Sequence, residues 1–311
     1  MSETGADDKA QGDTASWAVS LVVLAAVAVA IAFSMWPAKR SFAISVETTG
    51  LTLTPDRALS GDWFLPEAEL CLRKSSENRD VQSVQRSTRC NTRFYHSVIV
   101  TDAFFDIAPG ATLEVSREPE RGDLQIFVAS DATGETRLGD HGDLEKALIF
   151  LPAHTRETVQ SLPFSGMAVL GAIPRSGEKT LVKQGRYEVR ENSLVQQRPM
   201  TVARGDFFLG DRISITDGES PNPRAAVGFM LWASAGLDVQ LYTPPAHDFI
   251  KVERLGTEPT LLNANAIDRL LANPIPVLAS VVFALLASSF DLASRLLRQF
   301  SVKQTAARRR R

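Results

Sequence analysis

Between residues 41 and 265 of this 311-residue chain, apolar and polar positions alternate in several short runs. The first run places Phe42, Ile44 and Val46 on one side of an extended segment. A period of two turns one face toward a core and the other toward solvent, which is typical of antiparallel sheets. Further runs of this kind are centred on residues 51–53, 113–115, 124–128, 187–189, 213–215 and 239–241. The pattern predicts antiparallel strands throughout this region.

Turn-forming sequences separate the runs. Residues 118–122 (EPERG) predict a hairpin between two alternating strands, and 216–223 (TDGESPNP) has the composition of a loop. Only 143–151 and 263–271 have the periodicity of short helices. We therefore expect a mainly β fold, an antiparallel β-sandwich or barrel-like domain, built as one domain or as two subdomains divided near residues 130–165.

A run without charged residues precedes the β region. Residues 17–36 begin at Trp17 and end at Trp36, and as an α-helix they would extend about 30 Å, the thickness of a bilayer's hydrocarbon core. Tryptophans at both ends suit the two membrane interfaces. A cleaved signal peptide is the alternative, but the residues before the run are mainly acidic and the run exceeds the usual 7–15 apolar residues. We expect an uncleaved transmembrane helix.

A second uncharged run, residues 270–290, lies between Arg269 and Asp291. Pro274 and Pro276 fit the first turn of a helix. The alternative is a buried helix packed on the soluble domain. An uncharged run of this length near the end of a chain favours a second transmembrane helix.

The charges that flank the two runs predict the topology. Only Lys39 and Arg40 directly follow the first run, whereas seven basic residues follow the second. Basic tails stay cytoplasmic. We therefore expect residues 1–16 and 291–311 to be cytoplasmic tails and residues 41–265 to be extracytoplasmic, in a two-pass protein of the plasma (inner) membrane. The seven basic residues are Arg295, Arg298, Lys303, Arg308, Arg309, Arg310 and Arg311.

The C-terminal tail also has an amphipathic pattern. Leu292, Leu296 and Phe300 recur at helical spacing, and basic residues lie between them. Such a helix binds the surface of an anionic bilayer. The residues expected at the membrane interface are Trp17, Trp36, Arg295, Arg298 and Lys303.

Small residues recur four apart in both apolar runs, for example Ala26, Ala30 and Ser34 in the first. Such stripes let transmembrane helices approach closely. The expected partners are therefore the lipid bilayer and a protein, or a second copy bound through the transmembrane helices.

The chain contains two cysteines, Cys71 and Cys90, both in the expected extracytoplasmic region. Oxidising compartments favour a disulfide between such a pair. The bond would close a loop of about twenty residues and add about 3 kcal/mol to the free energy of unfolding.

No sequence pattern for catalysis is present. We expect no metal or cofactor, because the chain has no His/Cys metal motif, no nucleophile elbow and no phosphate-binding glycine loop. The formal net charge of −2 argues against a nucleic-acid partner. Two Gly-Asp pairs, at 205–206 and 210–211, predict two tight turns around a short Phe-Phe-Leu strand.

The sequence therefore favours a non-enzymatic membrane-anchored protein whose β domain is a scaffold or partner-binding module in an envelope complex. Two alternatives remain. One is a ligand sensor that couples the β domain to a transmembrane helix bundle, and the other is an envelope hydrolase with an unrecognised site.

Overall fold

The computed structural model of the chain is mainly β, with one large antiparallel sheet. It describes residues 39–74, 89–118, 120–131, 134–142, 144–171, 181–192, 199–218, 223–254 and 257–265, and single helical positions between 25 and 28 and between 267 and 289. Residues Ala38–Asn263 form one compact unit, called the β domain below, and Met1–Pro37 with Ala264–Arg311 form the other.

Sixteen strands and one short 3-10 helix, η1 (Ala153–Thr155), are defined within the described residues. The strands are β1 (Arg40–Thr48), β2 (Gly50–Pro55), β3 (Phe64–Arg73), β4 (Tyr95–Asp106), β5 (Thr112–Arg117), β6 (Leu124–Ser130), β7 (Arg137–Leu138), β8 (Leu148–Leu151), β9 (Leu162–Leu170), β10 (Val182–Asn192), β11 (Pro199–Phe207), β12 (Arg212–Thr216), β13 (Ala225–Trp232), β14 (Leu237–Tyr242), β15 (Phe249–Glu253) and β16 (Thr260–Leu262).

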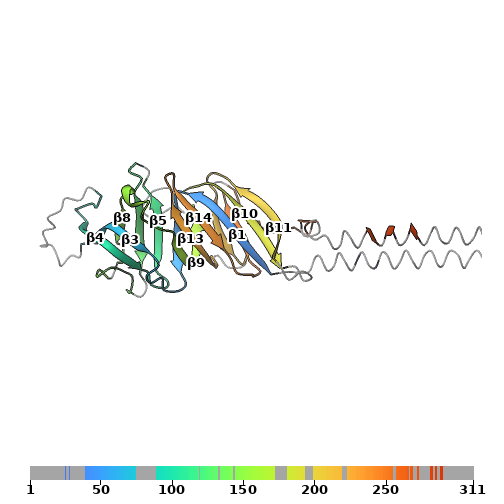
Figure 1. Cartoon of the computed structure of the whole chain (residues 1–311), viewed down its shortest axis with the longest axis horizontal. Helices are drawn as coiled ribbons and strands as arrows, with labels where there is room; N and C mark the ends of the chain where they lie inside the picture. The colour runs from blue at the N-terminus through green and yellow to red at the C-terminus, as the bar shows by residue number, and fades with distance from the viewer. Residues whose placement is uncertain are drawn as a thin grey trace, which may run out of the picture. The chain divides into compact units, whose positions relative to one another are not determined.

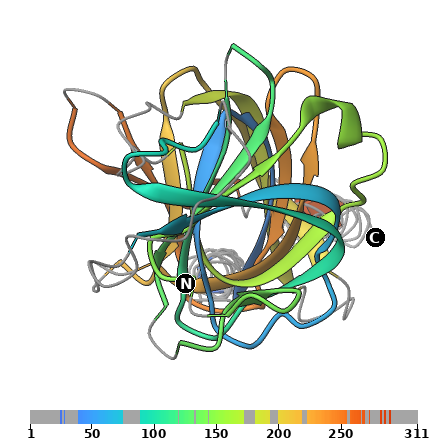
Figure 2. The same cartoon turned by 90° about the vertical axis from the view of Figure 1, so that its left-hand side faces the viewer.

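The sheet follows one long path, β11-β10-β1-β14-β13-β9-β2-β5-β6-β8-β3-β4-β7, with β12, β15 and β16 branching from β9. Figure 1 places β11 and β4 toward opposite ends of the β domain. Viewed along the long axis, the strands curve around a common centre (Figure 2). β9 connects two groups of strands, the group from β11 to β13 and the group from β2 to β7 along this path. It pairs with β13 on one side and with β2 on the other.

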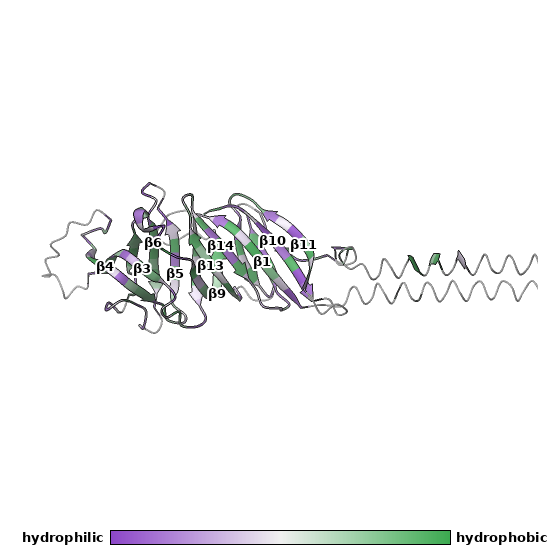
Figure 3. Cartoon of the chain, in the orientation of Figure 1, coloured by the Kyte–Doolittle hydropathy of each residue, from purple (hydrophilic) through white to green (hydrophobic). Residues whose placement is uncertain are grey.

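The predicted alternation produces the core. In β1 every second residue is buried, and Phe42, Ile44 and Val46 are at most 2% exposed. Figure 3 shows this alternation as colour changes along the strands. Just before β3, the buried Trp63 contacts Phe105 of β4 edge to face. Its Nε1 donates a hydrogen bond to the carbonyl of Pro163 (2.7 Å). Pairing the indole N–H avoids the cost of an unsatisfied buried donor.

All seven predicted runs are strands, and β5 and β6 form the predicted hairpin. The helix predicted over 143–151 is wrong, because Leu148–Leu151 is strand β8 between β3 and β6. The first predicted Gly-Asp turn is also wrong. Gly205 lies inside β11, where a Cβ would be 2.5 Å from the hydroxyl of Tyr187, so the glycine makes room for that ring.

The two ends of the β domain meet at one point. Arg40, the first residue of β1, donates from Nε to Glu191 Oε1 (2.9 Å) and from Nη1 to Oδ1 of Asn263. Arg40 and Glu191 are each 8% exposed. Burial raises the pKa of Glu191 above its ordinary value, although the hydrogen bond and charge of Arg40 act in the opposite direction. The chain therefore enters and leaves the β domain at the same place.

Among the described residues, no helix is both long and apolar enough to cross a bilayer. The two predicted spans, 17–36 and 270–290, lie largely outside the described residues, as does the C-terminal tail. The described positions within the second span are helical, and among them Val281, Val282 and Leu285 are more than half exposed.

Candidate functional site

An open groove of about 750 Å³ lies over strands β10, β1, β14 and β13 beside the end of β11. This volume is within the range of ligand-binding clefts. Its apolar lining residues are Val46, Phe207, Phe208 and Leu231. The other lining residues are Ser45, Glu47, Gln184, Gly185, Arg186, Asp206, Asp238 and Gln240.

Strand register determines which of these side chains share a face. Glu47 of β1 lies directly opposite Asp238 of β14, which lies opposite Leu231 of β13. Directly opposed residues of an antiparallel pair project from the same side of a sheet. Two carboxylates are therefore neighbours on the floor of the groove, and like charges in this arrangement are destabilising.

Positive charge compensates this repulsion only in part. Lys183 Nζ lies 3.1 Å from Glu47 Oε1, and the side-chain amide of Gln184 donates to Glu47 Oε2. Within the described part of the chain, Asp238 has no ion-pair partner, while Asp206 lies opposite Arg186 in the β10–β11 pair. The groove therefore favours a ligand that brings its own positive charge.

The rim of the groove carries an apolar protrusion, Phe208 and Leu209, called the tip below. Their side chains are 60% and 72% exposed. The tip is part of a tight turn closed by a hydrogen bond from Asp211 N to the carbonyl of Phe208 (3.1 Å). Gly210 has φ +86°, the left-handed conformation that favours glycine at the third position of such a turn. The second predicted Gly-Asp turn is thus confirmed, but Phe208 and Leu209 belong to the turn and not to a strand.

A buried carboxylate holds the tip in place. Asp211 is 1% exposed, and its Oδ2 accepts the backbone N–H of Phe208 (2.9 Å). Arg254 donates from Nε to Asp211 Oδ1 (2.7 Å), and its guanidinium lies 5.2 Å from the centre of the Phe208 ring. The hydrogen bond and charge of Asp211 raise the pKa of Arg254. Because the backbone and the ring of Phe208 are both held, Phe208 loses little conformational entropy on binding.

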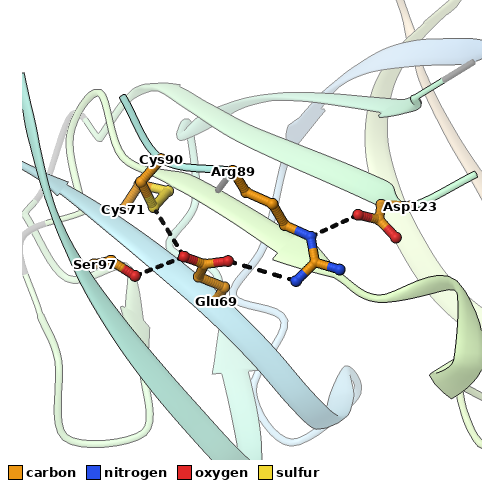
Figure 4. The surroundings of a disulfide bond; sticks show 6 residues. All are labelled: Glu69, Cys71, Arg89, Cys90, Ser97 and Asp123. Carbon is orange, nitrogen blue, oxygen red and sulfur yellow. Dashed lines mark hydrogen bonds and ion pairs between the residues drawn. A yellow bond between two sulfur atoms is a disulfide. The ribbon is translucent and has the colours of Figure 1, made fainter. Parts of the chain in front are cut away.

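The two cysteines form a second, structural cluster. Cys71 of β3 and Cys90 are joined by a disulfide, with Cα atoms 5.6 Å apart. The bond packs with Phe150 and Leu148 of β8 and with Tyr95, the first residue of β4. It therefore fixes the segment before β4 against the sheet (Figure 4).

Charged side chains surround the disulfide. Arg89 donates from Nε to Asp123 Oδ2 (2.7 Å), and its Nη1 lies 3.5 Å from Glu69 Oε2. The other oxygen of Glu69 accepts a hydrogen bond from Ser97 Oγ of β4 (2.6 Å) and contacts the Cys90 sulfur. Burial lowers the pKa of Arg89, but its two acidic neighbours outweigh this effect and raise it. The positive charge of Arg89 and the negative charges of Asp123 and Glu69 compensate one another, which indicates a structural role for this cluster.

The structure brings together Cys71 and Cys90 from the residues singled out in the sequence. Trp17, Trp36, Arg295, Arg298 and Lys303 lie outside the described residues. Among the residues that are described, no group of three or more His, Cys, Asp or Glu side chains could hold a metal ion. The groove and its tip were not predicted, and their only sequence signal is the Phe-Phe-Leu segment before Gly210.

Comparison with protein-family models, curated proteins and solved structures finds no match to this chain.

Proposed function

We propose that this protein is a membrane-tethered partner-binding module. In this proposal the coiled sheet is a barrel-like extracytoplasmic platform between two transmembrane helices. The bond between Arg40 and Asn263 supports the arrangement, because flanking segments that leave from one point can enter the same bilayer. The exposed apolar side chains of Val281, Val282 and Leu285, at helical positions, support a lipid environment for the second segment.

The partner-binding site in this proposal is the groove with its tip. The single observation that carries it is the exposed Phe208, whose backbone is held by Asp211, next to the exposed Leu209 and beside a surface of unbalanced negative charge. Rigid, exposed apolar side chains next to a concavity are typical of the anchor points of protein interfaces.

The chemistry of the groove defines the partner. An extended segment that runs across the strands would place an apolar side chain against Phe208, beside β11, and a Lys or Arg farther along the groove near Asp238. Partly exposed polar side chains along the floor, such as Ser45 and Gln240, would bind its backbone. The same groove without an apolar anchor would be a weaker site.

A site-specific crosslink tests this function. A photoreactive phenylalanine analogue replaces Leu209 in the full-length protein, and native membranes are irradiated. The matched control carries the analogue at Leu261, an exposed leucine of β16. We expect a crosslinked product from position 209 and none from 261, and mass spectrometry should place the bond in a segment with a neighbouring Lys or Arg. Equal products from both positions, or a captured segment of acidic character, would contradict the proposal.

A further inference from the structure

Strand β4 has a free edge. It pairs with β3 from Tyr95 to Phe104, whereas on its other side the two-residue strand β7 pairs only with Phe105 and Asp106. Among the described residues, no strand pairs with that second side from Tyr95 to Ala103. This edge lies at the end of the strand path opposite β11, away from the groove.

The hydrogen bonds beside β4 show which backbone groups face the edge. Lys74 N donates to the carbonyl of Phe94, the residue before β4, so the backbone groups of Phe94 face β3. Backbone groups alternate in direction along an antiparallel strand. The N–H and C=O groups of Ser97, Ile99 and Thr101 therefore point outward, up to Asp102, whose left-handed backbone (φ +51°) ends the alternation.

The side chains of this edge do not discourage pairing. Natural edge strands are protected by Lys, Pro or inward-pointing charges. Residues 95–101 of β4 (YHSVIVT) include no Lys, Pro, Asp or Glu, and Ile99 is 51% exposed. Such a strand is a template for a further strand.

Both ends of the edge are fixed. Tyr95 packs against the Cys71–Cys90 disulfide, and Ser97 is bound to Glu69. At the other end, Gly139 binds Phe104. Residues 95–101 are paired with β3 between these points, up to the left-handed Asp102, so pairing with them costs little ordering entropy.

We propose that β4 pairs with β4 of a second copy of this chain, antiparallel about a two-fold axis at Ile99. In this register Ile99 faces Ile99 of the second copy, Val98 faces Val100 and Ser97 faces Thr101. Apolar groups face apolar groups and hydroxyl groups face hydroxyl groups, combinations that stabilise cross-strand pairs.

The neighbouring registers lack this match. An axis at Val98 would place Ser97 opposite Ile99 and His96 opposite Val100. An axis at Val100 would place Val98 opposite Asp102 and Ile99 opposite Thr101. The sequence of β4 therefore favours one register over the two adjacent ones. This pairing is independent of the groove, so each site can be tested without the other.

Cysteine crosslinking of the full-length protein in mild detergent tests the pairing and its register. Ile99 belongs to a hydrogen-bonded pair in this arrangement, in which facing Cα atoms are about 5.5 Å apart, a separation that a disulfide can span. I99C should therefore form a covalent dimer on mild oxidation. V98C and V100C should each form no covalent dimer alone and should crosslink when mixed. Peptide mapping of the native Cys71–Cys90 bond checks that each variant is folded.

Light scattering supplies the second measurement. The wild-type protein should have twice the mass of one chain, and V100K, which places a charge on the edge, should have the mass of one chain. A dimer that survives V100K and gives no I99C crosslink would overturn the proposal and assign self-association to another surface. A wild-type monomer without crosslinks, or self-crosslinking by V98C or V100C in place of I99C, would also overturn it.

Discussion

Arg40 and Asn263 are hydrogen-bonded although they lie at opposite ends of the β domain's sequence. The same guanidinium neutralises the buried Glu191, so one side chain ties the first strand, the tenth strand and the exit of the chain together. The network thus holds the place where both flanking segments leave the β domain.

Replacing Arg40 by Met should strongly destabilise the β domain, because it leaves the carboxylate of Glu191 buried without its cation. Breaking a buried pair in this way costs about 3 kcal/mol, whereas the double variant R40M/E191M should recover most of the loss. Chemical denaturation followed by β-sheet circular dichroism measures both. A double variant no more stable than R40M would contradict this account.

The cost of R40M should depend on pH. Burial already holds the pKa of Glu191 above its ordinary value, and loss of Arg40 removes the group that lowers it. A raised pKa means that the folded state binds the proton more tightly than the unfolded state. The contribution of Glu191 to the free energy of unfolding therefore increases as pH falls through the folded pKa. The deficit of R40M relative to wild type should therefore shrink between about pH 7 and about pH 4.3, the ordinary pKa of Glu. An unchanged deficit would show that Glu191 does not titrate there.

The Cys71–Cys90 bond should be present in the isolated protein, and its loss should cost about 3 kcal/mol by the loop-entropy estimate. Mass mapping without reduction should recover the linked peptides. C71A/C90A should also lower the yield of the I99C dimer, because the disulfide holds the first residue of β4. Two freely alkylated thiols in fresh protein would reject the bond.

The sequence predicted the strands whose alternation faces one core, such as β1, because that signal is local. It failed at Leu148–Leu151, where a helix-like pattern is overridden by pairing with β3 and β6. Tertiary pairing outweighs intrinsic preference in such short segments.

The groove could not be predicted for a related reason. Glu47 and Asp238 become neighbours only because β1 pairs with β14, and their separation in the sequence gives no sign of it. The disulfide was easier to predict from the sequence, since two cysteines in one region allow only one pairing. The exposure of Phe208 and Leu209 could not be predicted from the sequence either. An apolar triplet before a Gly-Asp turn indicates a strand unless the position of the turn is known.

Removing a charge from the groove should separate stability from binding. D238N relieves the repulsion from Glu47, so the free energy of unfolding should rise by a few tenths of a kcal/mol. The same change should lower the yield of the Leu209 photocrosslink several-fold, because the partner's cation loses its counter-charge. Q240E, which adds an acidic group on the same strand, should have the opposite effect on both. A fall in both stability and crosslinking for D238N would indicate a purely structural role.

The proposed topology rests on the basic C-terminal tail and can be tested directly. A reporter active only in the periplasm should be active when fused at residue 177 and silent when fused after residue 311. The reverse pattern would place the β domain in the cytoplasm, where the disulfide would not persist. That outcome would overturn the membrane arrangement while leaving the strand pairing testable.

Rigidity of the tip depends on Asp211, so a change there should weaken binding without touching Phe208 or Leu209. D211A removes the acceptor of the Phe208 N–H and the partner of Arg254, and we expect a loss of about 2 kcal/mol because both bonds involve a charged group. R254K is the gentler variant, since it keeps the positive charge but lacks the planar group that reaches both the carboxylate and the Phe208 ring. We expect R254K to leave the unfolding midpoint within a degree or two, since Arg254 is half exposed, yet to lower the Leu209 crosslink several-fold. Crosslinking equal to wild type in R254K, with the fold intact, would show that the tip binds without being held in place.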